Sequence, residues 1–300
     1  MPVVRANDIE IAYESLGRED DPVILLIHGH NTPLTGWPDS LCGGLLRKGF
    51  RVVRFDNRDI GRSTHLSELG APDIRAILAK RMLGEQVEPP YALDDMADDA
   101  VALLGALGIE KAHVVGASMG GMIAQLVAIR RPEKTQSLIS IMSSTARPGL
   151  PPPDPEAIRT LMNVPASASR EDRLRTAMAA VRAISGAGFA PSDAELAAHL
   201  GRSIDYTPFD PPAAARQMAA IITAAPRNER LASLRIPALV LHGRDDPVVP
   251  VEHGEDTARS IPGAKLTIVP GMGHEFGEAL MPIFIREIGG FAERVEAAKG

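Results

Sequence analysis

The sequence predicts an α/β fold: a doubly wound, mostly parallel sheet with helices on both faces and a helical cap inserted between two strands. Short apolar runs alternate with helical stretches along most of the chain, which is typical of β-α-β crossovers. The runs are continuous rather than alternating, as in strands buried on both faces of a parallel sheet. Residues 145–230 have no strand pattern. We therefore expect a core of residues 1–144 and 231–300 and a cap of residues 145–230.

The expected elements follow from these runs and from the residues that end them. The strands are expected at Ile9–Tyr13, Val23–Ile27, Arg51–Phe55, Lys111–Gly116, Ser137–Ser143, Ala238–His242 and Lys265–Val269. The helices are expected at Gly36–Lys48, Leu93–Leu107 and Met119–Arg131. Gly49, Gly108 and Pro132 follow these helices directly, and such residues commonly end helices.

The expected cap begins with a proline cluster, Pro148–Pro155, and continues as helical segments rich in Ala and Arg. A smaller irregular stretch, Thr64–Pro90, is expected over the same face. Ligands of open α/β sheets bind beyond the carboxyl ends of the strands. A cap at that edge would form the walls of a pocket and exclude water from it.

The composition of the chain excludes several classes of function. The chain has 300 residues, 45% of them hydrophobic, and a net charge of −6 without a basic block, so nucleic acid is not an expected partner. Apolar runs such as the five residues Val23–Ile27 are too short to span a membrane, and no signal peptide is expected. The single cysteine, Cys42, excludes an intrachain disulfide and fits a reducing compartment, so we expect a cytoplasmic protein.

The strongest motif is Gly116-Ala117-Ser118-Met119-Gly120, which follows a predicted strand and precedes a predicted helix. This context is typical of a nucleophile elbow, whose sharp turn requires small flanking residues. Ser118 would also lie at a helix N-terminus, which favours developing negative charge. The alternative is a glycine-rich turn with an incidental serine. We predict that Ser118 is a nucleophile.

A serine hydroxyl needs a general base, and the base needs an acid that fixes its tautomer. His274 lies on a loop just past the last predicted strand, so we predict that it is the base. The acid should lie between Ser118 and His274 in the chain. Asp245 and Asp246 both follow the Ala238–His242 strand. We prefer Asp246, and Asp245 remains the alternative.

The oxyanion hole should combine two backbone amides. One is the N–H that follows the nucleophile, from Met119. The second should come from the loop after Val23–Ile27, where Gly29 permits a turn, and we assign it to the N–H of His30. The alternative for this loop is a plain turn at a strand end.

These motifs resemble the α/β-hydrolase superfamily over essentially the whole chain. The resembling segments are His28-Gly29, Asp56 through Ser63, the Ser118 elbow, Gly243 through Pro247 and Gly273-His274. Within the superfamily the sequence is most similar to bacterial carboxylesterases, and more narrowly to the aclacinomycin methylesterase-like proteins. That narrower resemblance lies in Asn31, Gly36 through Asp39, Asp56 through Thr64, and Pro270 through His274. It implies hydrolysis of carboxylic esters through an acyl-enzyme intermediate.

The sequence departs from the family at two positions. Asp59 stands where glycine is usual, and we interpret it as the mark of a subgroup rather than as part of the chemistry. His30 stands where the methylesterase-like pattern has glycine, which argues against a bulky polyketide substrate. We therefore expect a small-molecule ester of small to medium size as the substrate.

Other functions remain open. A C–C bond hydrolase, a lactonase or a cofactor-free perhydrolase would use the same triad, and a non-catalytic ligand receptor could share the fold. A dehalogenase or epoxide hydrolase would have aspartate at position 118, where this chain has Ser118. No metal-ligand spacing and no nucleotide-binding glycine motif is found, so we expect no metal and no cofactor. The sequence does not predict an oligomeric state.

Overall fold

A computed structural model describes residues 1–299 and contains one sheet in the order β1-β2-β4-β3-β5-β6-β7-β8. The strands are β1 (Val3–Ala6), β2 (Ile9–Leu16), β3 (Val23–Ile27), β4 (Arg51–Phe55), β5 (Ala112–Ala117), β6 (Thr135–Ile141), β7 (Ala238–Gly243) and β8 (Lys265–Val269). The first two pairings, β1 with β2 and β2 with β4, are antiparallel, and the others are parallel. The expected α/β fold with a mostly parallel sheet is confirmed.

The order of the strands positions the site. β3 lies between β4 and β5, and every residue of β3 and β5 is buried, as their continuous apolar runs require. The chain enters β3 at one end of the sheet and later enters β5 beside it, because Val23 pairs with Ala112. The carboxyl ends of β3, β5, β6, β7 and β8 therefore share one edge of the sheet.

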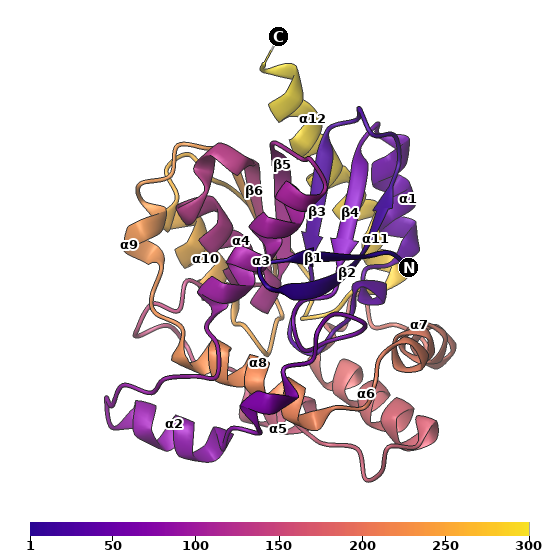
Figure 1. Cartoon of the computed structure of the whole chain (residues 1–300), viewed down its shortest axis with the longest axis vertical. Coiled ribbons are helices and arrows are strands. Elements are labelled where there is room, and N and C mark those ends of the chain that lie inside the picture. Colours follow the sequence, from indigo (N-terminus) through magenta and orange to yellow (C-terminus); the bar gives the residue numbers. More distant parts are fainter. Residues whose placement is uncertain (300) are drawn as a thin grey trace.

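Helices cover both faces of the sheet (Figure 1). The helices of the core are α1 (Asp39–Arg47), α3 (Leu93–Ala106), α4 (Met119–Arg130), α10 (Val251–Ser260), α11 (Met281–Phe284) and α12 (Gly290–Ala297). Apolar side chains of α3 and α4 pack into one core cluster, and those of α1, α11 and α12 pack into a second cluster on the opposite face. Both clusters bury strand residues between them, which fixes the sheet as the central layer.

The segment between β6 and β7, here called the cap segment (residues 145–230), is helical. It contains α5 (Pro155–Leu161), α6 (Arg170–Ile184), α7 (Asp193–Tyr206) and α8 (Pro211–Thr223), and α9 (Asn228–Leu231) begins at its end. Side chains of Asp154, Ser169, Ser192 and Asp210 accept backbone N–H groups at the starts of α5 to α8. In Figure 1 helices α5 to α8 gather at one end of the sheet, together with α2 (Ile74–Met82). That these residues form a separate domain stays a prediction.

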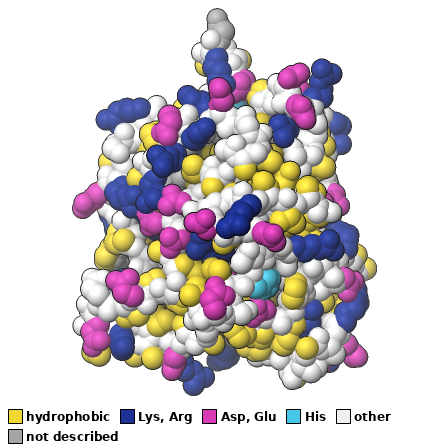
Figure 2. All heavy atoms as spheres, viewed as in Figure 1, with side chains coloured by type: hydrophobic (Ala, Val, Ile, Leu, Met, Phe, Trp, Pro, Cys, Tyr) yellow, Lys and Arg dark blue, Asp and Glu magenta, His cyan; other side chains and the backbone are white. Residues whose placement is uncertain are grey.

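Several boundaries differ from expectation. The helix expected from Gly36 begins at Asp39, because a 3₁₀ turn (Leu34–Gly36) and Pro38 precede it. The expected irregular stretch contains α2, and β1 was not expected at all. Among residues 1–299, no helix is both long and apolar enough to cross a bilayer. On the face seen in Figure 2, basic and acidic side chains are interspersed.

Candidate active site

Ser118 lies at the turn between β5 and α4. Its backbone has φ 55° and ψ −121°, a conformation that residues with side chains rarely adopt. A Cβ on Gly116 would lie 2.0 Å from the carbonyl oxygen of Gly120, and a Cβ on Gly120 would lie 2.0 Å from that of Ile27. Glycine at both positions lets strand and helix approach closely, so the turn lifts Ser118 beyond the sheet edge.

The neighbouring strand β6 holds this turn in place. The backbone N–H of Ser118 donates to the carbonyl oxygen of Ile141 at 3.0 Å. The hydroxyl of Ser143 donates to the carbonyl oxygen of Ser118 at 2.7 Å. A strained residue persists only where its surroundings fix it, and these two hydrogen bonds supply that constraint.

The structure brings the three predicted triad residues together. His274 Nε2 lies 3.0 Å from Ser118 Oγ, and His274 Nδ1 lies 2.7 Å from Asp246 Oδ2. The residues come from the loops after β5, β7 and β8, which end at the same sheet edge. Both distances are hydrogen-bonding distances, so a proton can pass from the serine hydroxyl to the imidazole while the carboxylate holds the other ring nitrogen.

The two candidate acids have different environments. Asp246 is 5% exposed, and its Oδ1 accepts the backbone N–H groups of Val248 and Val249 at 2.9 and 2.8 Å. Its Oδ2 is thereby turned toward His274. Asp245 is exposed, and the only hydrogen bond it makes among residues 1–299 is from its backbone N–H to the carbonyl of Met272. The geometry favours Asp246 over Asp245.

The loop after β3 approaches the nucleophile closely. A Cβ on Gly29 would lie 3.1 Å from Ser118 Cβ, so a side chain at this position would push the loop and the nucleophile apart by a few tenths of an ångström. Within residues 1–299, the backbone N–H of the next residue, His30, makes no hydrogen bond, and the N–H of Met119 is the first of helix α4, without a partner inside the helix. Both predicted oxyanion donors are therefore free to bind a ligand oxygen.

Helix α8 of the cap segment supports the same loop. The His30 imidazole Nε2 lies 2.8 Å from the carbonyl oxygen of Ala214, and the Asn31 N–H donates to Gln217 Oε1 at 2.8 Å. Gln217 is fully buried and also donates to the carbonyl of Arg58. Asn31 itself has φ 51°, so Gln217 stabilises a turn that asparagine tolerates better than most residues.

Two buried groups adjoin the site: Glu275, which the sequence did not single out, and His28 of the His28-Gly29 segment. Glu275 follows the predicted base and is 2% exposed, and burial raises its pKa to about 7. Burial lowers the pKa of His28 to about 3, so its ring is neutral, and Nδ1 accepts the N–H of Gly29. The one available signal for Glu275 was its place next to His274 in the chain.

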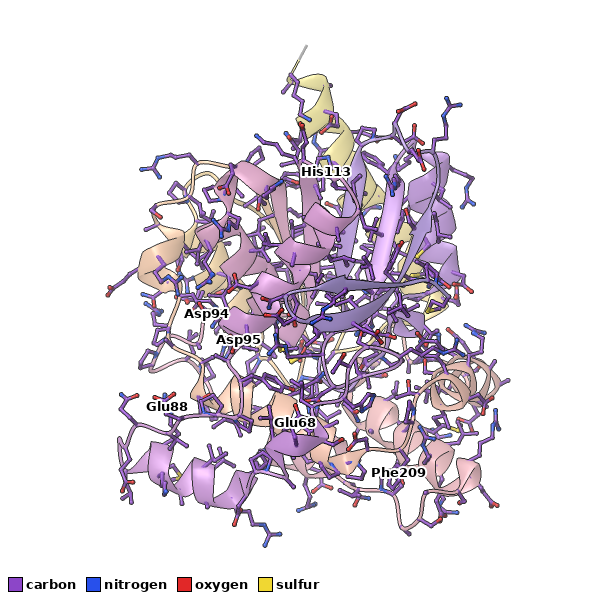
Figure 3. All side chains as sticks on the ribbon, viewed as in Figure 1. Glu68, Glu88, Asp94, Asp95, His113 and Phe209 are labelled. Carbon is purple, nitrogen blue, oxygen red and sulfur yellow. The ribbon has the colours of Figure 1, made fainter. Side chains whose placement is uncertain are left out.

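His113, in strand β5, is buried but remote from these groups. Figure 3 shows it at the end of β5 opposite the cap helices, near the C-terminal helix. Its ring contacts Ser137 Oγ and Glu296 Oε1. Across residues 1–299, no three His, Cys, Asp or Glu side chains are grouped so that they could hold a metal ion.

The family follows from this fold and from comparison with known proteins. A model of the alpha/beta hydrolase fold family matches residues 22–278. The chain belongs to this family, as its resemblance led us to expect, and the prediction of a hydrolytic enzyme is confirmed.

Similar proteins carry several hydrolase activities. The chain is 28% identical to the rhodomycin D methylesterase of Streptomyces peucetius over 299 residues, covering 91% of each. It is 26% identical to a 2-hydroxy-6-oxononadienedioate/2-hydroxy-6-oxononatrienedioate hydrolase of Burkholderia vietnamiensis, covering 89% of this chain and 85% of the relative. The crystal structure of an enol-lactonase from Burkholderia xenovorans matches with a TM-score of 0.71 and 21% identity, covering 97% of this chain and 100% of that one.

Proposed function

We propose that this protein is a serine carboxylesterase that hydrolyses small to medium carboxylic esters through an acyl-enzyme intermediate. The observation that carries the proposal is the continuous chain of contacts from Ser118 Oγ through the two ring nitrogens of His274 to the buried carboxylate of Asp246. The methylesterase relative supports the choice of an ester as the substrate.

Acylation follows from this geometry. Ser118 Oγ attacks the ester carbonyl as His274 Nε2 takes its proton, and Asp246 stabilises the imidazolium that forms. The carbonyl oxygen becomes an oxyanion, which the N–H groups of His30 and Met119 bind. Each such donor stabilises the transition state by about 2.7–4 kcal/mol.

The same groups complete acylation and then carry out deacylation. His274 Nε2 returns its proton to the leaving alkoxide, which departs as an alcohol. The imidazole then takes a proton from water, whose oxygen attacks the acyl carbon of the Ser118 ester. As the second tetrahedral intermediate collapses, the bond between the acyl carbon and Ser118 Oγ breaks and His274 Nε2 returns its proton to that oxygen, which releases the carboxylic acid and restores the serine hydroxyl.

The expected substrate size follows from the cover over the site. Ser118 and His274 are only partly exposed, and the contact of His30 with Ala214 brings helix α8 against the oxyanion loop. Helix α8 therefore lies beside the loop that we expect to bind the substrate oxygen. A cap helix at this place limits the room for the substrate, which supports small to medium esters over bulky polycyclic ones.

Hydrolysis of p-nitrophenyl esters from acetate to dodecanoate would test the proposal, with wild type beside Ser118→Ala. We expect measurable turnover of the shorter esters and a loss on the order of a million-fold in kcat for the alanine variant. Ser233→Ala, which removes an exposed serine hydroxyl far along the chain, is the matched control and should retain full activity.

A C–C bond hydrolase is the second candidate, because one relative at 26% identity is named as a hydrolase of 2-hydroxy-6-oxononadienedioate, a compound without an ester bond. The same triad would serve it. If wild type cleaves no p-nitrophenyl ester but cleaves a vinylogous 1,5-diketone acid in a Ser118-dependent manner, the carboxylesterase proposal is wrong and the C–C hydrolase replaces it. If Ser118→Ala retains ester hydrolysis, the proposed nucleophile is wrong.

A further inference from the structure

The loop that carries His274 is bonded to the cap segment as well as to the core. The backbone N–H of His274 donates to the carbonyl oxygen of Ile184, the last residue of α6, at 2.8 Å. Four residues after Ile184 and three residues before His274, the N–H of Gly188 donates to the carbonyl oxygen of Gly271 at 3.0 Å. The exit of α6, residues 184–188, thus runs beside residues 271–275, and we call these two segments together the histidine seam.

Glycines allow the two backbones of the histidine seam to touch. A Cβ on Gly186 would lie 2.2 Å from the carbonyl oxygen of Gly271, and a Cβ on Gly273 would lie 2.4 Å from that of Ile184. Neither position can hold a side chain without separating the segments. Movement of the α6 exit is therefore transmitted directly to the backbone beside His274.

Glu275 joins the two sides of the seam. Its Oε2 accepts the N–H of Gly186, from the cap segment, at 3.1 Å and the N–H of Gly273, from the histidine loop, at 2.9 Å. Its Oε1 is buried and has no hydrogen-bond partner among residues 1–299. The charged and titratable groups that act on this carboxyl are Asp246 and His274, and the α6 exit contributes only its backbone amide.

We propose that Glu275 is a positioning residue for His274: its carboxyl ties the α6 exit to the histidine loop, so that the cap segment holds the catalytic base in line with Ser118. The inference rests on the proposed function, because it assigns His274 as the base. It assigns Glu275 no contact with the substrate.

The placement of the bonds supports positioning over general stabilisation. Glu275 Oε2 accepts the backbone N–H of Gly273, the residue before His274, and Glu275 is the residue after it. The side chain of Glu275 therefore holds the backbone on both sides of His274. The imidazole must reach Ser118 Oγ and Asp246 Oδ2 at the same time. Since a misplacement of about 1 Å can cost about 100-fold in rate, a loosened loop should lower kcat before it lowers stability.

The test compares Glu275→Leu with Glu275→Gln. Glutamine keeps one oxygen that can accept both amides, whereas leucine fills similar space and accepts neither. On p-nitrophenyl acetate we expect Glu275→Leu to lose about 100-fold in kcat with KM changed less than about threefold, and Glu275→Gln to stay within about threefold of wild type. The downfield proton resonance of His274 Nδ1–H, which reports the bond to Asp246 and needs no substrate, should weaken in the leucine variant and persist in the glutamine variant.

The matched control is Glu195→Leu. Glu195, in the cap segment, also accepts a core backbone amide, that of Glu278 at 2.7 Å, but it does not contact the histidine seam. We expect this variant to retain wild-type kcat and the resonance. Equal losses in Glu195→Leu and Glu275→Leu would overturn the proposal, because any contact between cap and core would then suffice.

Two further outcomes would overturn it: wild-type kcat with an unchanged resonance in Glu275→Leu, or a loss in Glu275→Gln equal to that in the leucine variant. Should Glu275→Leu fail to fold, Gly186→Ala replaces it, since its Cβ would lie 2.2 Å from the carbonyl oxygen of Gly271 and separate the two segments that Glu275 joins. That variant should show the same loss of kcat, and full activity in it would contradict the proposal. If wild type cleaves no ester, the proposed function fails, while the resonance still decides the role of Glu275.

Discussion

Asp59 and Arg216 form an ion pair that joins the core to the cap segment and is closed to solvent. Arg216 Nε and Nη2 donate to the two carboxylate oxygens of Asp59 at 2.8 and 2.7 Å, and the exposed fractions of the side chains are 1% and 0%. Arg216 Nη1 also donates to the carbonyl of Gly70, which precedes α2. One guanidinium thus connects α8 to the loop after β4 and to the approach to α2.

Replacing one partner should be far more harmful than replacing both. Arg216→Met leaves the Asp59 carboxylate buried without its cationic partner, with the N–H of Leu66 still donating to it, which we expect to lower the free energy of unfolding by about 3–5 kcal/mol. Asp59→Asn with Arg216→Met removes both charges, keeps an oxygen that accepts the N–H of Leu66 and suits the φ of 66° at this position, so it should recover most of that loss. Urea unfolding of the single and double variants measures this. A double variant no more stable than Arg216→Met would show that the pair itself contributes the stability.

Asparagine substitutions distinguish the two adjacent acids. Asp246→Asn presents an amide to His274 Nδ1 in place of a carboxylate, so it favours the wrong tautomer and we expect kcat to fall roughly 10⁴-fold. Asp245→Asn is the matched control, because Asp245 is exposed and its side chain lies outside the hydrogen-bonded chain. Steady-state kinetics on p-nitrophenyl acetate measures both. A large loss in Asp245→Asn with none in Asp246→Asn would exchange their roles.

Gly29→Ala should damage the oxyanion loop. The new Cβ would lie 3.1 Å from Ser118 Cβ and 3.3 Å from the carbonyl oxygen of Ala117, so the loop must shift and its His30 N–H with it. Losing one oxyanion donor costs about 10²–10³-fold in kcat, which sets the expected range. Gly105→Ala, in the exposed part of α3 with nothing within 4 Å of its Cβ, is the control and should retain activity. Wild-type kcat in Gly29→Ala would remove His30 from the oxyanion hole.

The pKa of Glu275 predicts how stability changes with pH. Burial raises this pKa from 4.5 to about 7, so between these values the unfolded chain releases a proton that the folded protein retains. Stability from this group is therefore lost as pH rises from about 4.5 to 7, and is constant above and below that window. Over the window the loss is about 3 kcal/mol.

Glu275→Gln does not titrate, so its stability relative to wild type should increase between pH 5 and pH 8, by about 2–3 kcal/mol. Urea unfolding at both pH values, with Glu195→Gln as the control for loss of a carboxyl elsewhere, measures the difference. Parallel pH profiles of wild type and Glu275→Gln would show that the pKa of Glu275 is not raised in the folded protein.

Much of the sheet could be predicted because its central strands are buried on both faces. The runs Val23–Ile27 and Arg51–Phe55 match β3 and β4 at both ends. The run Lys265–Val269 also matches the edge strand β8, although only Val269 of it is buried. β1 (Val3–Ala6) could not be predicted in the same way, since only Ala6 of it is buried and its order depends on backbone pairing with β2.

The grouping of Ser118, Asp246 and His274 was predictable for a related reason: strands that run parallel end at one edge, so residues that follow them lie close together. The contacts that the cap segment makes with the core could not be predicted. Asp59 was interpreted only as a subgroup mark, because its partner Arg216 reaches it through the docking of α8, which local sequence does not encode. The link from Glu275 to Gly186 is hidden for the same reason.

The contact between residues 184–188 and residues 271–275 has a consequence for the evolution and redesign of this enzyme. A chimera that took its cap segment from a relative would gain new pocket walls, and would also lose one side of the support of His274. Substrate choice and turnover are therefore inherited together. Grafts that keep residues 184–188 of this chain would separate the two traits and allow specificity to be exchanged alone.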